Sequence, residues 1–385
     1  TEGFATGGEG RVFEDERKIL EEHGHVVYPL ICSNSEATEA NLIGKAKAFW
    51  NASWSPVGYE RISAAIKEFR PDIIHSHNYF LVLSPSIFRA AKDHHIPVVV
   101  TLHNYRLISP CSLLLRNGQI CELCVGRNPW RILLYRCYRD NFLYSMLRYR
   151  FYYLSQKIHG WHSDIDKFIT LTEFGRQMHI RGGIPSHKVV VKPNSCLDPL
   201  AGKDPTEPGY GALFLGTITP EKGVENLVKA WGEIDYPLDL LGEGSMRKSL
   251  EAQAPAPVKF HGVVSHSEVF NKLRQCAFLV MPSICYEGLP LVLIEAMASG
   301  RPVIATRRGA MKTVVEDGVT GLLFEPDNVD DMREKVKTMI NSRELRVRLG
   351  RAARQRYLES YTPERTYEKL MQIYEETLTS RNNNR

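Results

Sequence analysis

The sequence predicts an α/β protein built from two doubly wound domains, each a parallel sheet with helices on both faces. Three observations favour this fold class. The chain has 385 residues, which is enough for two compact domains with sizeable cores. Short apolar runs typical of buried strands alternate with amphipathic segments typical of helices. A segment rich in Pro, Asp and Gly, residues 193–209, separates two such series and is expected to be the hinge between domains.

The first series opens with apolar positions at helical spacing over 9–22, stopped by Gly24. The elements expected after it are a strand at 25–31, a helix at 57–69, strands at 72–75 and 97–102 around a helix at 84–94, and strands at 167–171 and 188–191 around a helix at 173–180. The polar stretch 34–55 is expected to be a mobile loop. A doubly wound domain needs a central first strand before the Gly-rich start, so we expect the natural N-terminus to lie upstream of Thr1.

The second series has the same alternation. Strands are expected at 212–215, 238–241, 258–261, 278–281 and 302–304, and helices at 291–297, 327–340, 344–360 and 364–378. In open sheets of this kind ligands gather at the carboxyl ends of the strands. The tail, residues 381–385, is expected to be disordered.

The stretch 281–306 has the most specific chemistry. A buried strand is followed by a turn through Glu287, and an apolar run from Leu291 predicts a helix that Gly300 ends. The first N–H groups of such a helix lack intrahelical acceptors and carry partial positive charge, which suits a phosphate. Glu295 lies eight positions after Glu287, so one carboxylate can lie at the mouth of the turn and the other one or two helical turns deeper.

Through its pattern P-S-x3-E-G-x-P-L-x-L-x-E-A-M-A-S-G-x-P-V-I-A, this stretch resembles the Glu-x7-Glu signature of the retaining nucleotide-sugar glycosyltransferases of family 4. The resemblance implies the GT-B fold, two Rossmann-like domains facing a cleft. It also implies that Glu287 contacts hydroxyls of the donor sugar and that Glu295 binds the ribose hydroxyls. The backbone expected to hold the diphosphate and the sugar comprises Gly288, Leu289, Pro290, Leu291 and Val292. The alternative is an ordinary αβ unit with a chance pair of glutamates.

The segment from Gly216 to Gly223 resembles the family motif G-R-x-x-x-E-K-G. The resemblance implies that Lys222 places its ammonium on the donor diphosphate, against the alternative of a solvated lysine. The arginine of the family is Thr217 here. Stabilisation of the leaving group would then fall to Lys222, to helix termini or to another basic residue, for which Arg307 and Arg308 are candidates.

Three more glycine turns resemble parts of the family. The Thr6-Gly7-Gly8 turn resembles the glycine loop of the N-terminal domain that faces the donor phosphate; a plain helix N-cap is the alternative. Gly242, in a Gly-Glu-Gly turn, resembles the turn near the nucleotide. Gly262 follows a strand that resembles the edge accepting the nucleobase through backbone groups.

Two histidines follow expected strands in the first half. His103 lies in Thr101-Leu102-His103-Asn104-Tyr105, which resembles the family pattern T-x-H-D-Y, whose histidine contacts the transferred sugar. A neutral imidazole there could hydrogen-bond a sugar hydroxyl. Asn104 replaces the aspartate of the family and removes a counter-charge. His77 stays open between a structural and a catalytic role. The resemblance thus gives His103, Lys222 and Glu287 as the catalytic residues.

Eight cysteines do not suggest a disulfide framework in a chain of this size. Four of them lie in a turn-rich segment that includes a C-x2-C pair, and they could form a tetrahedral zinc clip; these are Cys111, Cys121, Cys124 and Cys137. Reduced thiols packed under a loop are the alternative, and neither interpretation makes these residues catalytic. The resemblance requires no cofactor or metal for the chemistry.

The segment 127–157 is basic and aromatic. Trp and Tyr favour the lipid headgroup region, and Arg and Lys favour anionic leaflets, so a peripheral membrane contact or a lipid-linked acceptor site is one interpretation. A long helix with its aromatic side chains packed inward is the second, and stacking on a glycan acceptor is the third. A formal charge of +5 is too small to argue for nucleic acid. No apolar run is long enough to cross a bilayer.

Taken together, the sequence predicts an acceptor-binding domain over 1–200 and a donor-binding domain over 201–362, with a last helix at 363–380 that returns to the first. The expected activity is retaining, metal-independent transfer of a hexose or N-acetylhexosamine from a UDP- or GDP-sugar to a hydroxyl of a glycan or lipid-linked acceptor, in polysaccharide or glycolipid biosynthesis. The expected location is the cytoplasm, including the inner face of the plasma membrane. A non-catalytic nucleotide-sugar-binding protein is the alternative; an epimerase of the same shape would need acid–base carboxylates that the first half does not offer.

Overall fold

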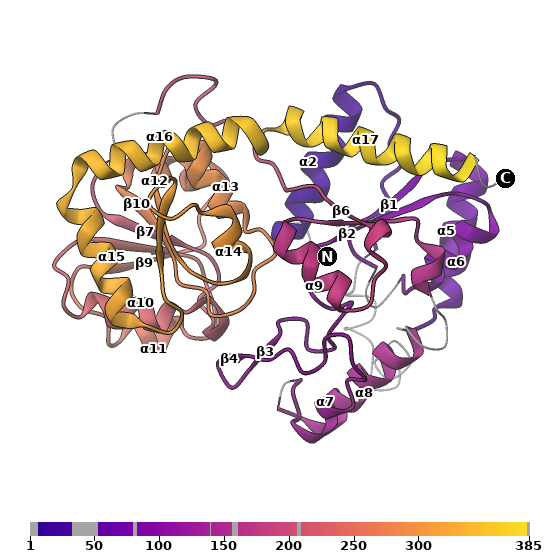
Figure 1. Ribbon diagram of the computed structural model, residues 1–385, viewed down its shortest axis with the longest axis horizontal. Coiled ribbons are helices and arrows are strands. Elements are labelled where there is room, and N and C mark those ends of the chain that lie inside the picture. Colours follow the sequence, from indigo (N-terminus) through magenta and orange to yellow (C-terminus); the bar gives the residue numbers. More distant parts are fainter. Residues whose placement is uncertain are drawn as a thin grey trace. The chain divides into compact units, whose positions relative to one another are not determined.

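A computed structural model describes residues 7–32, 53–79, 83–138, 140–155, 161–205 and 209–382. They form two compact units. Unit 1 contains residues 1–114, 121–192 and 367–385, and unit 2 contains residues 115–120 and 193–366. Each has a parallel sheet with helices around it, which confirms the predicted fold class (Figure 1). Most of the loop expected at 34–55 and the end of the tail at 381–385 lie outside the described residues.

The sheet of unit 1 has four parallel strands in the order β1-β2-β5-β6. The strands are β1 (Ile74–Ser76), β2 (Val98–Leu102), β5 (Lys167–Thr170) and β6 (Val189–Val191). The helices between and before them are α2 (Gly8–Glu22), α5 (Pro56–Phe69), α6 (Ser86–Asp93) and α9 (Glu173–Arg181). Ser55 and Thr172 cap α5 and α9: their hydroxyls accept hydrogen bonds from the N–H groups of Gly58 and Gly175.

The strand expected at 25–31 is not formed, so this prediction is wrong. The segment has no regular structure, and Val26 and Ile31 are 81% and 52% exposed. The described part of the sheet ends at β1, whose ladder partner there is β2. A single strand gains little without a neighbour to receive its hydrogen bonds, and Pro29 has no N–H to offer one.

The last helix, α17 (Pro363–Asn382), belongs to unit 1 from Tyr367 onward. Its buried face carries Leu370, Ile373 and Tyr374, which pack in one apolar cluster with Val99 of β2 and Ile169 of β5. This packing attaches a segment from the end of the chain to the centre of the first sheet (Figure 1).

A long excursion separates β2 from β5. It contains a two-stranded hairpin, β3 (Leu115–Arg116) and β4 (Gln119–Ile120), then the helices α7 (Arg131–Leu134) and α8 (Phe142–Tyr153) and the 3-10 turn η2 (Trp161–Asp164). The Asn117-Gly118 pair has positive φ at both residues, as a tight hairpin turn requires. In the described part of 127–157, two short helices therefore stand where one long helix was an alternative.

The sheet of unit 2 has six parallel strands in the order β12-β11-β10-β7-β8-β9. The strands are β7 (Ala212–Leu215), β8 (Leu238–Leu241), β9 (Val258–Gly262), β10 (Phe278–Met281), β11 (Val303–Thr306) and β12 (Gly321–Phe324). From β7 the chain builds outward to β9, and from β10 it builds outward in the other direction. The carboxyl ends of β7 and β10 therefore flank the point where the strand order reverses, and there doubly wound sheets bind ligands.

Helices cover both faces of this second sheet (Figure 1). They are α10 (Val224–Trp231), α11 (Arg247–Glu251), α12 (His266–Gln275), α13 (Leu291–Ala298), α14 (Gly309–Val314), α15 (Val329–Asn341) and α16 (Arg343–Ser360), with the 3-10 turn η4 (Pro220–Lys222) before α10. Helix α13 is almost entirely apolar, Glu295 excepted, and nearly all of it is buried. Its position directly after β10 places its N-terminus at the point of reversal.

Candidate functional site

Three glycine turns meet backbone to backbone at the carboxyl ends of β7, β8 and β9. The Gly216 N–H donates to the carbonyl of Leu241, and the Gly242 N–H donates to the carbonyl of Gly262 over 2.7 Å. A Cβ on Gly242 would lie 1.9 Å from the Gly216 oxygen. Because no side chain fits there, the backbones of these turns lie in direct contact at this edge of the sheet.

Lys222 and Glu287 meet at the same edge. The ammonium donates to Oε1 of Glu287 over 2.7 Å, and both side chains keep some exposure, 28% and 13%. Burial lowers the pKa of Lys222, but the charge and hydrogen bond of Glu287 outweigh it, so the pKa is raised. The site therefore holds a positive charge at neutral pH that can also reach an anion from solvent.

The pair is held by backbone contacts between η4 and the turn after β10. The Ile284 N–H donates to the Glu221 carbonyl over 3.0 Å, and the Ser283 hydroxyl donates to the Glu287 carboxylate over 2.7 Å. Gly223 permits this approach: its φ is +68°, and a Cβ there would lie 2.0 Å from the oxygen of Pro282. The structure thus brings together two residues that are 65 positions apart.

Helix α13 begins beside this pair. Its N-cap is Pro290, whose side chain cannot accept a hydrogen bond from the N–H groups of the first turn. Asn194 donates to the Leu289 carbonyl over 3.1 Å and pins the turn. The segment 288–292 therefore lies where an anion could approach the helix N-terminus.

Glu295 lies deeper in α13. Its side chain is 2% exposed, and its Oε1 lies 3.1 Å from Nε2 of His266, the first residue of α12. His266 is 48% exposed, so the pair connects a buried carboxylate to the surface. His266 was not among the predicted site residues, because its partner lies on another helix.

The candidates for the missing arginine function differ in what they touch. Thr217 lies next to Thr219, with 3.4 Å between their hydroxyls. Arg307 pairs with Asp317 over 2.5 Å and Glu325 over 2.9 Å. Arg308 donates to the carbonyl of Ile284, within the turn that carries Glu287, and pairs with Asp327 over 2.9 Å. Of the two arginines, Arg308 is the one in contact with the signature turn.

A second polar group lies at the carboxyl ends of β1 and β2 in unit 1. Nδ1 of His77 lies 3.1 Å from Nε2 of His103. One step further, Asn78 and Asn104 both donate to the carboxylate of Glu9 in the first turn of α2, over 3.0 and 3.1 Å. Glu9 thus brings a carboxylate to Asn104, the position at which the family's aspartate is absent.

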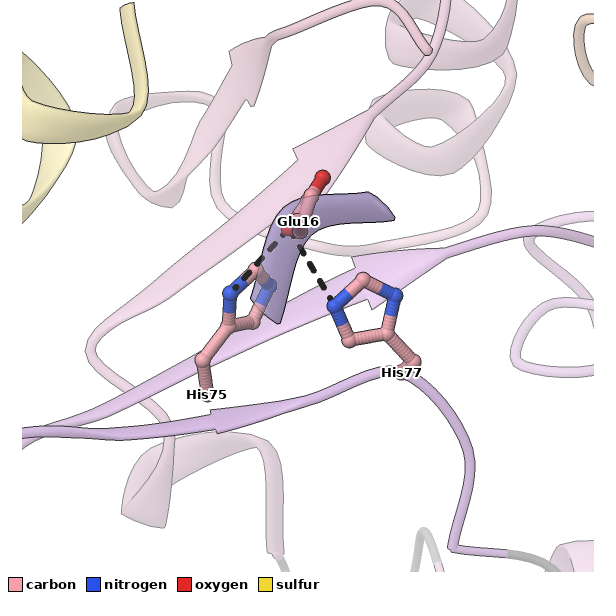
Figure 2. A group of neighbouring side chains, drawn as sticks. All are labelled: Glu16, His75 and His77. Carbon is pink, nitrogen blue, oxygen red and sulfur yellow. Dashed lines mark ion pairs between the residues drawn. The ribbon is translucent and has the colours of Figure 1, made fainter. Parts of the chain in front are cut away.

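Next to the His77–His103 contact, Glu16 of α2 lies between two histidines (Figure 2). They are His75 of β1 and His77 of the segment that follows β1. Oε2 of Glu16 is 3.3 Å from Nε2 of His77 and 3.7 Å from Nδ1 of His75. Its Oε1 pairs with Lys192, whose side chain is 1% exposed. Burial alone would raise the pKa of Glu16, but Lys192 and the histidines hold it well below its usual value.

Glu16, His75 and His77 are close enough for one metal ion, yet the side chains are already engaged. Nδ1 of His75 is 2.8 Å from the Tyr374 hydroxyl and its Nε2 is 2.7 Å from the Thr101 hydroxyl. Lys192 supplies the positive charge that Glu16 needs. We therefore interpret this group as a buried polar network. A sign of it was in the sequence: Glu16 stands in line with Val12 and Ile19, on the buried side of α2.

The remaining predicted site residues lie at element ends. Gly7 is the N-cap of α2 and Gly8 its first residue; no side-chain hydrogen bond caps this helix, and Thr6 lies outside the described residues. Gly262 ends β9 beside Arg247, whose guanidinium pairs with Glu243 of the Gly-Glu-Gly turn. These placements leave the anion-binding roles of Gly7, Gly8, Gly242 and Gly262 as predictions.

The four cysteines of the predicted zinc clip all lie in unit 1. Burial, followed by the neighbouring thiols of Cys111, Cys137 and Cys121, raises the pKa of Cys124 to about 12. The thiols are thus neighbours. Among the described residues they do not make a group whose sulfurs all lie within 4.8 Å. Zinc stays a prediction.

The basic and aromatic segment exposes many large apolar side chains on and around α7 and α8. They are Trp130, Leu134, Tyr135, Phe142, Leu143, Tyr144, Met146 and Tyr153. Only part of its aromatic content is packed inward, as at Tyr152. Among the described helices, none combines the length and apolar character needed to span a bilayer.

Two family models match consecutive parts of the chain. Glycosyltransferase Family 4 matches residues 6–196, and Glycosyl transferases group 1 matches residues 204–356. The boundary between the matches falls within the segment predicted to be the hinge.

Solved glycosyltransferase structures show the same fold. Sucrose-phosphate synthase from Thermosynechococcus elongatus aligns with a TM-score of 0.69 at 17% identity, over 97% of this chain and 94% of that chain. A glycosyltransferase from Rickettsia africae gives 0.66 at 18% identity, over 97% and 96%. Anabaena Alr3699/HepE, solved in complex with UDP, gives 0.65 at 15% identity, over 96% of each.

Curated relatives match over shorter stretches. An uncharacterized glycosyltransferase of Methanocaldococcus jannaschii is 37% identical over 168 residues, 43% of this chain and 47% of the relative. Sulfoquinovosyl transferase SQD2 of Arabidopsis thaliana is 33% identical over 148 residues, 37% of this chain and 29% of the relative. The chain thus spans about half or less of the length of these relatives. With both family models matched in order and the GT-B fold formed, the chain belongs to the glycosyltransferases that pair a family 4 domain with a group 1 domain.

Proposed function

We propose that this chain is a retaining glycosyltransferase that moves a hexose or N-acetylhexosamine from a UDP- or GDP-sugar to an acceptor hydroxyl, in polysaccharide or glycolipid biosynthesis. The observation that carries the proposal is the Lys222–Glu287 pair, 2.7 Å apart and partly exposed, beside the N-terminus of α13. A nucleotide-sugar carries phosphate groups next to sugar hydroxyls. A site that binds it therefore needs a cation for the phosphates and a carboxylate for the hydroxyls close together.

Each group has a task in the proposal. Lys222 and the first N–H groups of α13 bind the diphosphate, and Glu287 accepts hydrogen bonds from hydroxyls of the donor sugar. Glu295 binds the ribose hydroxyls, which would join the contact that His266 already makes. UDP in the structure of Anabaena Alr3699/HepE supports a uridine nucleotide as the first donor to test.

The proposed reaction takes place on one face of the sugar. The bond between the anomeric carbon and the phosphate oxygen breaks, and a bond from that carbon to the acceptor oxygen forms on the same side. The acceptor proton passes to the departing phosphate oxygen. Lys222 and the helix N-terminus stabilise the charge on the diphosphate as it leaves, so no metal is required by this scheme.

The first experiment measures donor binding by calorimetry with UDP, UDP-glucose and GDP-mannose. Lys222→Met should weaken binding roughly 10- to 100-fold, since a hydrogen bond to a charged group contributes about 1.5–3 kcal/mol. Lys229→Met is the matched control: Lys229 pairs with Glu225 over the same 2.7 Å but is 61% exposed on α10. Equal affinity of both variants and the wild type would refute the proposed phosphate site.

A second measurement decides between transfer and mere binding. A non-catalytic nucleotide-sugar-binding protein would bind UDP-sugar but would neither hydrolyse it nor transfer it to polyprenyl-diphosphate glycans. Mass spectrometry of such mixtures should show transfer, and NMR of the isolated product should show the anomeric configuration of the donor. Glu287→Gln should reduce the transfer strongly. Tight binding without any turnover across the donor and acceptor panel would favour the binding protein.

We also propose that the exposed side chains around α7 and α8 contact a membrane surface or a lipid-linked acceptor. Phe142 and Leu143 are 53% and 57% exposed at the start of α8, and Trp130 is 47% exposed before α7. Arg131 stacks on the Trp130 ring at 5.3 Å, so a cation lies beside the exposed aromatic side chain. Apolar and cationic groups that share a surface suit an anionic bilayer.

A structural zinc ion at Cys111, Cys121, Cys124 and Cys137 is a further part of the proposal. The clustered thiols support it. Several residues near them have positive φ, including Ser112, Leu114 and Arg136, although they are not glycine. Such backbone is costly unless its surroundings hold it, and a metal clip would do so.

A further inference from the structure

A continuous line of polar side chains runs through unit 1 from Lys192 to His103. The Lys192 ammonium pairs with Oε1 of Glu16; Oε2 of Glu16 lies 3.3 Å from Nε2 of His77, and Nδ1 of His77 lies 3.1 Å from Nε2 of His103. Figure 2 shows Glu16 with both His75 and His77 turned toward it. The sequence resemblance covers His103 alone, so the residues behind it have no assigned role.

The position of each hydrogen in this line follows from the charges and the contacts. Glu16 is ionised, because the Lys192 ammonium at its Oε1 outweighs the effect of burial and holds the pKa of Glu16 below its usual value, so its oxygens only accept. His77 therefore presents its hydrogen at Nε2. Lys192 and Glu16 already cancel in charge, and their side chains are 1% and 7% exposed. A ring with one hydrogen, placed at Nε2 toward the carboxylate, adds no net charge to a side chain that is 4% exposed, and it keeps a lone pair on Nδ1.

The same reasoning reaches His103. A lone pair on Nδ1 of His77 needs a donor, and the atom 3.1 Å away is Nε2 of His103. Burial lowers the pKa of His103 to about 3, so this ring is neutral and carries a single hydrogen. That hydrogen is at Nε2, and Nδ1 is left as an acceptor.

His75 is the other ionisable ring next to Glu16, and it does not disturb this order. Its Nδ1 faces both the Tyr374 hydroxyl at 2.8 Å and Glu16 at 3.7 Å, and its Nε2 faces the Thr101 hydroxyl at 2.7 Å. Burial, followed by His77, lowers the pKa of His75 well below its usual value, so it adds no positive charge. Hydroxyl groups can donate or accept, and they satisfy either tautomer of this ring.

We propose that Glu16 and His77 are positioning residues that fix His103 as the Nε2–H tautomer, so that its Nδ1 can accept a hydrogen bond but cannot donate one. Within the described residues, Nδ1 of His103 makes no hydrogen bond, and the side chain is partly exposed. The partner that this atom selects is a hydroxyl donor. In the proposed function, on which this step rests, that partner is a hydroxyl of the transferred sugar, and a phosphate oxygen would be refused.

The test is the tautomeric state of His103 in the full chain labelled with 15N-histidine, read from two-bond 1H–15N correlations without substrate. His103 should show hydrogen at Nε2. His179 is an internal control in the same spectrum: its Nδ1 lies 2.8 Å from the Gly175 carbonyl, which only accepts, so we expect hydrogen at Nδ1. An Nδ1–H tautomer or an imidazolium at His103 in the wild type overturns the proposal.

Two variants separate positioning from a structural effect. His77→Phe keeps the ring volume and the Glu16–Lys192 pair but removes the acceptor, so His103 should lose its single tautomer. In Glu16→Gln with Lys192→Met, the new amide can donate to Nε2 of His77, and the hydrogens of both rings can move to Nδ1. His179 should not change in either variant. An unchanged His103 spectrum in folded His77→Phe contradicts the proposal.

The tautomer of His103 is measured without turnover, so the positioning proposal and the proposed function can fail separately. If His103 has the expected tautomer but no transfer is found, the proposed function fails and the positioning holds. If transfer is found but His103 carries its hydrogen at Nδ1, the positioning fails. Where transfer is measurable, His77→Phe should lower kcat and leave UDP affinity within twofold, since UDP has no hydroxyl of the transferred sugar.

Discussion

Gly223 offers a sharp test of how the phosphate site is assembled. It has φ of +68°, and a Cβ there would lie 2.0 Å from the Pro282 oxygen and 2.9 Å from the Pro282 carbonyl carbon. Gly223→Ala should cost about 1–2 kcal/mol for the left-handed conformation and a further 1–3 kcal/mol for the clash with rigid backbone. To relieve the clash the turn after β10 must move, and Glu287 moves with it. We therefore expect about 2–5 kcal/mol of destabilisation together with at least tenfold weaker UDP binding.

Gly318→Ala is the matched control in the same unit. Gly318 has φ of +75°, but nothing lies within 4 Å of a Cβ built on it. This variant should pay only the conformational cost and bind UDP as the wild type does. Urea unfolding and calorimetry on both variants give the two numbers. Equal destabilisation of the two variants, with equal UDP affinity, would refute the view that the approach of Gly223 to Pro282 sets the position of Glu287.

Three further predictions concern other parts of the chain. The pKa values of His75, His103 and His179 are lowered in the folded state, so the unfolded chain binds more protons below about pH 6.5. The urea midpoint of unit 1 should therefore fall as the pH drops from 7 to 5. A midpoint that does not change with pH would contradict this. The purified chain should contain about one zinc ion per molecule. The Cys124→Ser variant should lose this zinc, and the Cys276→Ser variant should keep it. Purified protein without zinc, in which all thiols react freely with a thiol reagent, would exclude the four-cysteine zinc site. Phe142→Ser with Leu143→Ser should weaken binding to anionic vesicles roughly 30- to 1000-fold, since the two side chains together contribute about 2–4 kcal/mol when both are buried in the bilayer surface. Val263→Ser, at a residue 77% exposed in unit 2, should not weaken it.

The sequence was most informative where local pattern and tertiary structure agree. The strand β10 and helix α13 were predicted within one residue, because a fully apolar strand, a Pro-containing turn and a glycine stop leave little choice. The strand at 25–31 failed for the opposite reason. Its apolar residues satisfy the pattern of a strand, but a strand exists only through a neighbour, and sequence spacing does not supply one.

The polar contacts were predictable only in part. The resemblance pointed to Lys222 and Glu287, but nothing local says that residues 65 positions apart make a 2.7 Å contact. The contact of Glu9 with Asn78 and Asn104 could not be predicted, since it joins three elements. Glu16 was a missed opportunity, because a carboxylate in line with the buried residues of a helix needs a buried partner.

Exposure separates the roles of the two lysine–glutamate pairs. Lys192 and Glu16 are 1% and 7% exposed, so either partner left alone would be a buried charge, and breaking such a pair costs about 3–5 kcal/mol. Lys222 and Glu287 are 28% and 13% exposed, and water can stabilise each charge while the pair opens. Lys222 can therefore share its ammonium with an arriving diphosphate at small cost, whereas Lys192 cannot leave Glu16. The pair in unit 2 is suited to exchange a partner for a ligand, and the pair in unit 1 is suited to hold the charge that orders the histidines beside it.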